Sequence, residues 1–331
     1  MKVYLIITAV LTVILIVLPV VMWNIPFSET EETYIVSETA STALTPQAEE
    51  TTSKSDTVKV LRVNSGNIAE TEVFDYIVGV VASEMPPTYE KEAIKAQCVV
   101  SYTYLKWIME NADNSSFENA DITDSSSKHQ GYMNYGELKD KWQDKYDVYI
   151  SKIKECVKET EGQYLTYEGK PILACYHSLS PGKTESAKNV WKKDLPYLQS
   201  VNAPGDKLSP DIDSTVTFSK DEFNKICEKL SGKSNKSGDI FENLTATETG
   251  FVKSITIYGK DFDGNDVRSA FSLKSPYFTI EKDKDKFVFK IKGYGHGLGM
   301  SQYSADYMAR QGSSYDEILK HFYKGVQINK S

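Results

Sequence analysis

An uninterrupted apolar segment near the N-terminus constrains this chain more than any other feature. Residues 3–23 (VYLIITAVLTVILIVLPVVMW) carry no charge, and a helix needs about 20 such positions to cross a bilayer core. We therefore expect residues 1–23 to form a single transmembrane anchor. Only Lys2 precedes the segment, and three glutamates follow it within residues 29–32, which favours a cytoplasmic N-terminus. A cleaved signal peptide is the alternative, although the run is long for one and no small-residue cleavage pattern follows it.

The rest of the chain divides by composition. Residues 24–57 are rich in Ser, Thr and Glu, which predicts a flexible linker. Residues 58–331 are enough for one large domain or two joined lobes with a substantial core. The net charge of −8 and the scattered Lys and Arg residues exclude a nucleic-acid partner, which needs a basic face. Cys98 and Cys175 lie in apolar runs, which favours buried thiols over disulfides.

Hydrophobic periodicity predicts both helices and strands after the linker. The predicted helices cover residues 72–81, 89–109, 146–160, 219–230, 302–310 and 315–322, and the longest, 89–109, has one buried face. The predicted strands cover 58–63, a hairpin at 163–178 with a turn at Glu168-Gly169, and 251–260, 267–274 and 286–293. Helices and strands occur in blocks, so the predicted fold class is α+β, with one transmembrane helix and a linker before it.

An acidic residue in an apolar sequence is the first candidate for chemistry. Glu84 lies between two predicted helices, beside Val80, Val81 and Met85. Partial desolvation disfavours a carboxylate and raises its pKa toward the range of a general acid, so Glu84 is suited to protonate a glycosidic oxygen. The structural alternative is a helix-end carboxylate that accepts backbone hydrogen bonds from the next helix.

A second polar group follows a predicted strand. His177 and Ser178 end this strand, and Gly182-Lys183-Thr184-Glu185 form a loop after it. Residues 182–184 look like the end of a P-loop, but the first glycine of that motif would fall on His177, which excludes a nucleotide site. The loop is instead suited to donate hydrogen bonds to sugar hydroxyls. A solvated turn without a ligand is the alternative.

Four glycines alternate around one histidine in GYGHGLGMSQ, residues 293–302. Such a loop lets the backbone approach a ligand and directs N–H groups and His296 into one space. The spacing is not the G-x-G-x-x-G of dinucleotide sites, because Leu298 and Met300 fall where the third glycine would be. A tight structural crossover is the alternative.

Several other enzyme classes lack their signatures here. The chain contains neither H-E-x-x-H nor G-x-S-x-G, the motifs of zinc proteases and of serine hydrolases. The four histidines are far apart in sequence, so a metal site would depend on the fold to gather them. They are His129, His177, His296 and His321. We expect no metal and no other cofactor.

These segments, taken in order, resemble the stage II sporulation protein D family of endospore-forming bacteria. The resemblance covers residues 58–326. It depends on SEMP (83–86), EAIKAQCVVSYTY (92–104), YHSLSPGKTESAKNVW (176–191), PYLQSV (196–201), GYGHGLGMSQYSA (293–305) and ILKHFYKGV (318–326). Tyr102 stands where many members carry arginine, and Cys98 where many carry alanine.

The resemblance implies a peptidoglycan lytic transglycosylase. Such an enzyme cuts the β-1,4 bond from N-acetylmuramic acid (MurNAc) to N-acetylglucosamine (GlcNAc) in strands stripped of stem peptides, and it leaves a 1,6-anhydro end. The family's catalytic glutamate falls on Glu84, which would protonate the leaving oxygen and then take the proton of the C6 hydroxyl. Supporting substrate-binding roles are expected for His177, Ser178, Thr184, Glu185, His296 and Gln302.

The resemblance also implies a setting and partners. It places the catalytic domain outside the cytoplasm at the engulfing mother-cell membrane, with a sporulation cell-wall amidase and a multispanning membrane protein as partners. Some members bind zinc through cysteine and histidine after the long helix, but residues 121–132 here contain only His129, so zinc is not expected. The main alternative is a non-catalytic, wall-binding amidase enhancer, and a purely structural anchor is the third.

Overall fold

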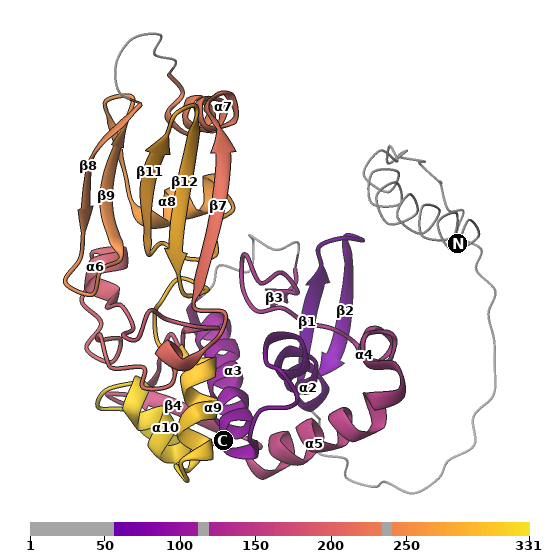
Figure 1. Ribbon diagram of the computed structural model, residues 1–331. Coiled ribbons are helices and arrows are strands. Elements are labelled where there is room, and N and C mark those ends of the chain that lie inside the picture. Colours follow the sequence, from indigo (N-terminus) through magenta and orange to yellow (C-terminus); the bar gives the residue numbers. More distant parts are fainter. Residues whose placement is uncertain (1–55, 112–118, 234–239) are drawn as a thin grey trace, which may run out of the picture. The chain divides into compact units, whose positions relative to one another are not determined.

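The computed structural model describes residues 56–111, 119–233 and 240–331, all within one compact unit, Ser53–Ser331. Its sheets have only two or three strands each. Most strand pairs are antiparallel, and helices separate the sheets along the chain (Figure 1). The predicted α+β class is confirmed for these residues.

The membrane-spanning part of the fold prediction is corrected. In the three described ranges, no helix is both long enough and apolar enough to cross a membrane. The helix α3 (Lys91–Asn111) has the length, at 21 residues, but it carries three lysines and two glutamates, which are costly in a bilayer core. The segment predicted to span the membrane, residues 3–23, and the linker up to residue 55 lie outside the described residues.

The first hydrophobic cluster surrounds α2. This helix is apolar on all sides and buries every residue of Tyr76–Ala82, because α3, α5 and β1 cover it together. The strand β1 pairs with β2 in antiparallel and with β3 in parallel orientation. The elements of this part are β1 (Thr57–Arg62), β2 (Asn67–Glu72), α2 (Val73–Glu84), α3, β3 (Ile122–Thr123), α4 (Tyr135–Trp142), the 3-10 helix η2 (Gln143–Lys145) and α5 (Tyr146–Glu159).

The helix α3 is shared with a second cluster. Ile94 and Leu105 pack into the first cluster, whereas Ala96 and Val100 pack into the second, so α3 buries two faces and not the one predicted. The second part contains β4 (Gln163–Tyr167), β5 (Lys170–Pro171), β6 (Tyr176–His177), α6 (Ala187–Trp191), η3 (Asp206–Leu208), β13 (Met300–Ser301), α9 (Gln302–Arg310), α10 (Tyr315–Phe322) and β14 (Gln327–Lys330).

A third cluster lies between two three-stranded antiparallel sheets and two helices. The sheets have the orders β11-β12-β7 and β10-β9-β8, and Phe223 of α7 stacks on Phe287 of β12 with ring centroids 3.9 Å apart. These elements are β7 (Asp213–Ser219), α7 (Lys220–Ser231), β8 (Phe241–Ala246), β9 (Val252–Ile257), β10 (Lys260–Phe262), α8 (Gly264–Ala270), β11 (Phe278–Asp283) and β12 (Lys286–Lys292).

The strand predicted at residues 267–274 is wrong, because this segment overlaps α8. Asp263 caps the helix by accepting hydrogen bonds from Asn265 N (2.8 Å) and Asp266 N (2.9 Å). Val267 and Phe271 are both buried, and a spacing of four residues places them on one side of a helical turn. The alternating apolar residues of 267–274 are therefore compatible with a strand and with a short capped helix, and the sequence pattern does not distinguish the two.

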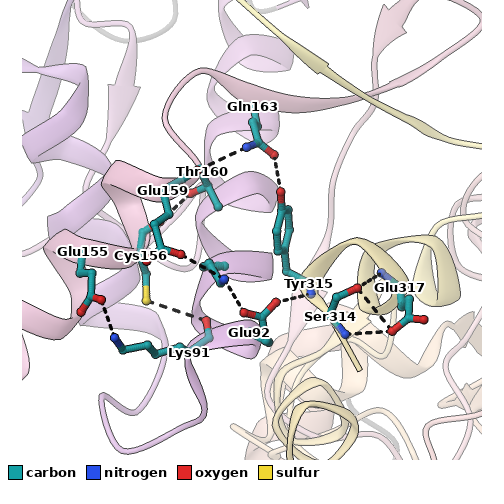
Figure 2. Close-up of polar contacts among 11 residues, drawn as sticks. Lys91, Glu92, Glu155, Cys156, Glu159, Thr160, Gln163, Ser314, Tyr315 and Glu317 are labelled. Atoms are coloured by element: carbon teal, nitrogen blue, oxygen red, sulfur yellow. Dashed lines mark hydrogen bonds and ion pairs between the residues drawn. The ribbon is translucent and has the colours of Figure 1, made fainter. Parts of the chain in front are cut away.

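Polar contacts attach the start of α3 to α5 and α10 (Figure 2). Lys91 pairs with Glu155 of α5 at 2.5 Å, and Lys95 pairs with Glu159 at 3.1 Å. Glu92 accepts a hydrogen bond from Tyr315 N at 2.8 Å, where α10 begins. Exposed ion pairs contribute little individually, but together these contacts orient α3 at the junction of two clusters. The four cysteines are free, and three of them are buried.

Candidate active site

Glu84 is the last residue of α2, where the chain turns through two prolines toward α3. This is the corner between two helices that the sequence predicts. The side chain is partly buried, and burial raises the pKa of its carboxyl above the usual range. The backbone N–H of Gly131, the charge of Lys141 and the Tyr176 hydroxyl act in the lowering direction. The C-terminal, negative end of α2 also disfavours a carboxylate here.

A loop far along the chain holds the carboxyl of Glu84. The backbone N–H of Gly131, 47 residues later, donates a hydrogen bond to Oε1. A Cβ atom at position 131 would lie 2.8 Å from this oxygen and 3.0 Å from Ser83 Oγ. Glycine therefore allows the backbone to approach the acid, and the donor belongs to this loop and not to the next helix.

Gln130, in the same loop, joins three elements beneath the acid. Its side chain is buried, and Nε2 lies 3.4 Å from the hydroxyl of Tyr76 in α2 and 3.3 Å from the carbonyl of Ser101 in α3. Its Oε1 accepts a hydrogen bond from the Tyr176 hydroxyl of β6 at 3.3 Å. Since that hydroxyl also affects the pKa of Glu84, one amide side chain orients both the loop and the tyrosine beside the acid.

The hydrogen-bond network continues to α9. Gln302 Nε2 donates to Gln97 Oε1 at 3.2 Å, and Gln97 Nε2 donates to Ser101 Oγ at 3.1 Å. Both glutamines are buried. Gln302, predicted to bind substrate, is thus connected to the loop at Glu84 through α3.

The strand β6 directs neighbouring side chains to opposite sides. Tyr176 lies toward Glu84, whereas His177 lies beside His296, with ring centroids 5.9 Å apart, because successive residues of a strand alternate. The strand pairs in parallel with β13, which brings the glycine-rich loop against residues 175–177. A Cβ at Gly299 would lie 1.9 Å from the carbonyl oxygen of Cys175, so this approach requires glycine.

Hydrogen bonds to Leu298 define the tautomers of the two histidines. His177 Nδ1 lies 3.0 Å from Leu298 O and donates to it, which leaves Nε2 without a proton. This Nε2 is buried and has no partner among the described residues. His296 Nδ1 accepts from Leu298 N at 3.0 Å, so its proton is on Nε2. Burial lowers the pKa of His177 to about 4 and that of His296 to about 3, and both rings are neutral at pH 7.

Thr184 and Glu185 make hydrogen bonds within the fold. Thr184 Oγ1 accepts from Val201 N at 2.9 Å. Glu185 is 1% exposed, and its carboxylate accepts hydrogen bonds from Ser186 N, Asn189 Nδ2, Thr247 Oγ1 and Thr249 Oγ1. The side chain thereby connects the start of α6 to the turn between β8 and β9. Ser178 is exposed.

The predicted site residues are thus divided among three places. Glu84 and Gln302 belong to one network, His177 and His296 form a pair on the other side of β6, and Glu185 stabilises a junction with the third cluster. Their roles as catalytic and substrate-binding residues stay predictions. The chemically relevant arrangement is the partly buried acid, with a backbone donor and a tyrosine hydroxyl beside it.

His129, the one histidine in residues 121–132, has protein partners. Its Nδ1 accepts a hydrogen bond from Thr123 N at 3.1 Å and lies 3.0 Å from Thr123 Oγ1. In residues 56–111, 119–233 and 240–331, no three His, Cys, Asp or Glu side chains are grouped so that they could hold a metal ion. The expectation that no cofactor binds stays a prediction.

Sequence reasoning missed Gln130, Gly131 and Tyr176. Gln130 and Gly131 lie in a polar stretch whose composition is that of an ordinary loop, and no local pattern connects position 131 with position 84. Tyr176 precedes a residue that was singled out, but in sequence it looks like any aromatic residue of a strand. The second strand of the predicted hairpin at 163–178 supplied one usable signal, because alternation places Tyr176 and His177 on opposite faces.

Comparisons with known proteins agree with the motifs. A family model described as "Stage II sporulation protein" matches residues 62–167, which include Glu84, Gln130 and Gly131. Stage II sporulation protein D of Bacillus subtilis (strain 168) is 33% identical over 338 residues, covering 100% of this chain and 97% of that protein. Its counterpart from Bacillus amyloliquefaciens is 36% identical over 276 residues, covering 83% of this chain and 79% of that protein.

A more distant relative has another name. The amidase enhancer of Bacillus subtilis (strain 168) is 28% identical over 305 residues, covering 76% of this chain and 40% of that protein. The two stage II sporulation proteins match at higher identity and over most of their own length. The chain therefore belongs to the stage II sporulation protein D family.

Proposed function

We propose that this protein is a lytic transglycosylase that cleaves MurNAc-β-1,4-GlcNAc bonds in peptidoglycan strands stripped of stem peptides. The observation that carries the proposal is the environment of Glu84. Its carboxyl is partly buried at the end of α2, with a raised pKa, beside the Gly131 N–H and the Tyr176 hydroxyl. A raised pKa keeps more of the acid protonated and ready to donate.

The reaction needs one acid with two tasks. Protonated Glu84 donates its proton to the glycosidic oxygen as the bond from C1 of MurNAc breaks, and GlcNAc leaves with a free 4-hydroxyl. The Glu84 carboxylate then takes the proton of the MurNAc C6 hydroxyl, whose oxygen bonds to C1 and closes the 1,6-anhydro ring. Glu84 is protonated again at the end.

This route needs no second acid beside Glu84. Ordinary glycosidases use a second carboxylate as base or nucleophile. Among the described residues, no other carboxylate contributes to the pKa shift of Glu84. An attack by the substrate's own C6 hydroxyl replaces the nucleophile that a hydrolase would supply.

The biological setting belongs to the proposal. Peptidoglycan lies outside the cytoplasm, so we place the domain there, acting during engulfment of the forespore. A cell-wall amidase would supply strands without stem peptides, and a multispanning membrane protein would complete the complex. His177, Ser178, Thr184, Glu185, His296 and Gln302 are proposed to support substrate binding, directly or through the loops they hold.

The second candidate function is a non-catalytic amidase enhancer that binds the wall. The similarity to the amidase enhancer of Bacillus subtilis favours it. An enhancer binds glycan and stimulates another enzyme without releasing anhydro sugars, so the reaction products separate the two functions.

The test is product analysis with purified full-length protein. Denuded glycan strands are incubated with the protein, and mass spectrometry measures 1,6-anhydro-MurNAc ends. We expect these ends to form, and we expect Glu84→Gln to reduce the rate at least about 100-fold, as for loss of a general acid. Glu110→Gln, which changes an exposed acid at the end of α3, is the matched control and should cleave normally. Binding without any cleavage would support the enhancer instead, and unchanged cleavage by Glu84→Gln would remove Glu84 from the mechanism.

A further inference from the structure

A pocket of about 310 Å³ lies between the loop after β6 and the end of α10. Lys183 pairs with Asn202 in an isolated β-bridge, and His321 Nε2 lies 2.6 Å from Asn202 O. Three chain segments are therefore held together at one place. The lining residues are Lys183, Ser200, Val201, Asn202, His321 and Lys324.

The pocket carries unneutralised positive charge. Lys183 and Lys324 are exposed, and within the described part of the chain neither forms an ion pair. Lys320, one turn earlier on α10, instead pairs with Asp316 at 2.9 Å. The whole chain has a net charge of −8, whereas the pocket carries two unpaired ammonium groups. This local positive charge favours an anionic ligand.

The donors around the pocket are suited to a carboxylate. Ammonium groups form strong, charge-assisted hydrogen bonds to carboxylate oxygens, and the Ser200 hydroxyl and the Asn202 amide add neutral donors. His321 uses Nε2–H toward Asn202 O, which leaves Nδ1 for a ligand hydroxyl. The volume equals roughly ten water molecules at about 30 Å³ each, which is room for a carboxylate and the short carbon chain that bears it.

We propose that this pocket binds a carboxylate of peptidoglycan, in the first place the lactyl carboxylate that MurNAc exposes once its stem peptide is removed. The inference rests on the proposed function, because it identifies the ligand from the proposed substrate. Stripped strands carry this carboxylate on every second sugar, so a strand bound at Glu84 presents a regular series of them. In an intact strand the same carboxyl is an amide, which carries no charge. The pocket thus lets the protein distinguish stripped from intact strands.

Equilibrium binding by the full-length Glu84→Gln protein tests this pocket, because that substitution is expected to slow cleavage and Glu84 does not line the pocket. Isothermal titration calorimetry measures the affinity for three probes. The first is a denuded glycan oligomer, the second is the same oligomer with its carboxylates converted to neutral methylamides, and the third is a glycan with stem peptides. Two exposed ion pairs give an expected preference of about 10-fold for the carboxylate over the methylamide form. The preference should shrink as salt is raised.

Lysine variants in the same background locate the preference. Lys183→Gln combined with Lys324→Gln should reduce it below about 2-fold, whereas Lys320→Gln, in the preceding helix α10 and paired with Asp316, should retain it. Circular dichroism melting confirms that each variant is folded. Stronger binding of the glycan with stem peptides, lost in the double variant, supports a carboxylate pocket and assigns its ligand to the stem peptide.

Two results would overturn the inference. One is equal affinity for all three probes, and the other is a preference that survives the double lysine substitution. The proposed function fails separately, since it requires anhydro ends from the wild-type protein whatever the calorimetry shows.

Discussion

Replacement of Gly131 by alanine tests whether the loop positions the acid. A Cβ at this position would lie 2.8 Å from Glu84 Oε1 and 3.0 Å from Ser83 Oγ, closer than the roughly 3.5 Å of ordinary non-bonded contact. The carboxyl must therefore move away from the Gly131 N–H that donates to it. Gly131 is not in the left-handed region, so alanine introduces this contact without a backbone penalty.

The expected loss of activity follows from that hydrogen bond. A hydrogen bond to a charged group contributes about 1.5–3 kcal/mol, and weakening it by about half removes roughly 1 kcal/mol or slightly more. Each 1.36 kcal/mol in the barrier is a factor of ten, so kcat/KM should fall about 10-fold. The Gly131 N–H lowers the pKa of Glu84, so its loss raises this pKa further. Because the proton donor is lost as pH rises through the pKa, the alkaline limb of the pH profile should move to higher pH.

The assay is the release of anhydro ends as a function of pH, alongside thermal melting. Alanine also reduces the entropy of the unfolded chain by about 0.4–1 kcal/mol, so the melting temperature should change little. Gly66→Asn is the control, because a Cβ there meets nothing within 4 Å and φ is +71°, a conformation that asparagine tolerates. Wild-type kcat/KM together with an unmoved alkaline limb in Gly131→Ala would refute the positioning role of the loop.

Two further predictions concern stability. Glu185→Ala removes the acceptor from four buried or partly buried donors and should cost about 2–4 kcal/mol of unfolding free energy in urea. The exposed control Glu248→Ala should cost less than about 0.5 kcal/mol, and lost activity at full stability in Glu185→Ala would instead indicate substrate binding. Burial lowers the pKa of His177 from 6.5 to about 4, so the unfolded chain binds the proton first, and stability is lost as pH falls from about 6.5 to about 4. Between pH 7 and 4.5 the loss of unfolding free energy amounts to about 2 kcal/mol. His177→Asn should reduce the measured pH dependence of stability by this amount, and an unchanged dependence would contradict the role of His177.

Local patterns predicted the elements that carry their own signals. The helices at 302–310 and 315–322 coincide with α9 and α10, and a Ser314–Glu317 capping box explains the sharp start of α10. The hairpin turn at Glu168-Gly169 is also confirmed, between β4 and β5. The predicted buried face of α3 includes Ala96 and Val100, which pack into the second cluster. The sequence did not reveal the other buried face, with Ile94 and Leu105, because a single face at helical spacing already accounts for the apolar pattern.

The candidate acid was predictable because it, too, carries a local signal in the sequence. The apolar neighbours of Glu84 and its place at the end of a helix are sequence features, and the direction of its pKa shift agrees with them. Its hydrogen-bond donor was not predictable, because Gly131 reaches it across 47 residues. A glycine that is required only for its lack of a side chain leaves no local pattern in a single sequence.

The environment of the acid depends on all the packing around α3. Gln130 binds α2, α3 and β6 at once, and α3 reaches Gln302 through Gln97. The polar network therefore connects a loop of the first cluster to the junction of β13 and α9 in the second. Strand alternation at β6 separates Tyr176 from His177, so the conspicuous histidines lie on the side opposite to Glu84. It follows that removing the Gln130 amide should disturb Glu84 more than removing the ring of His177.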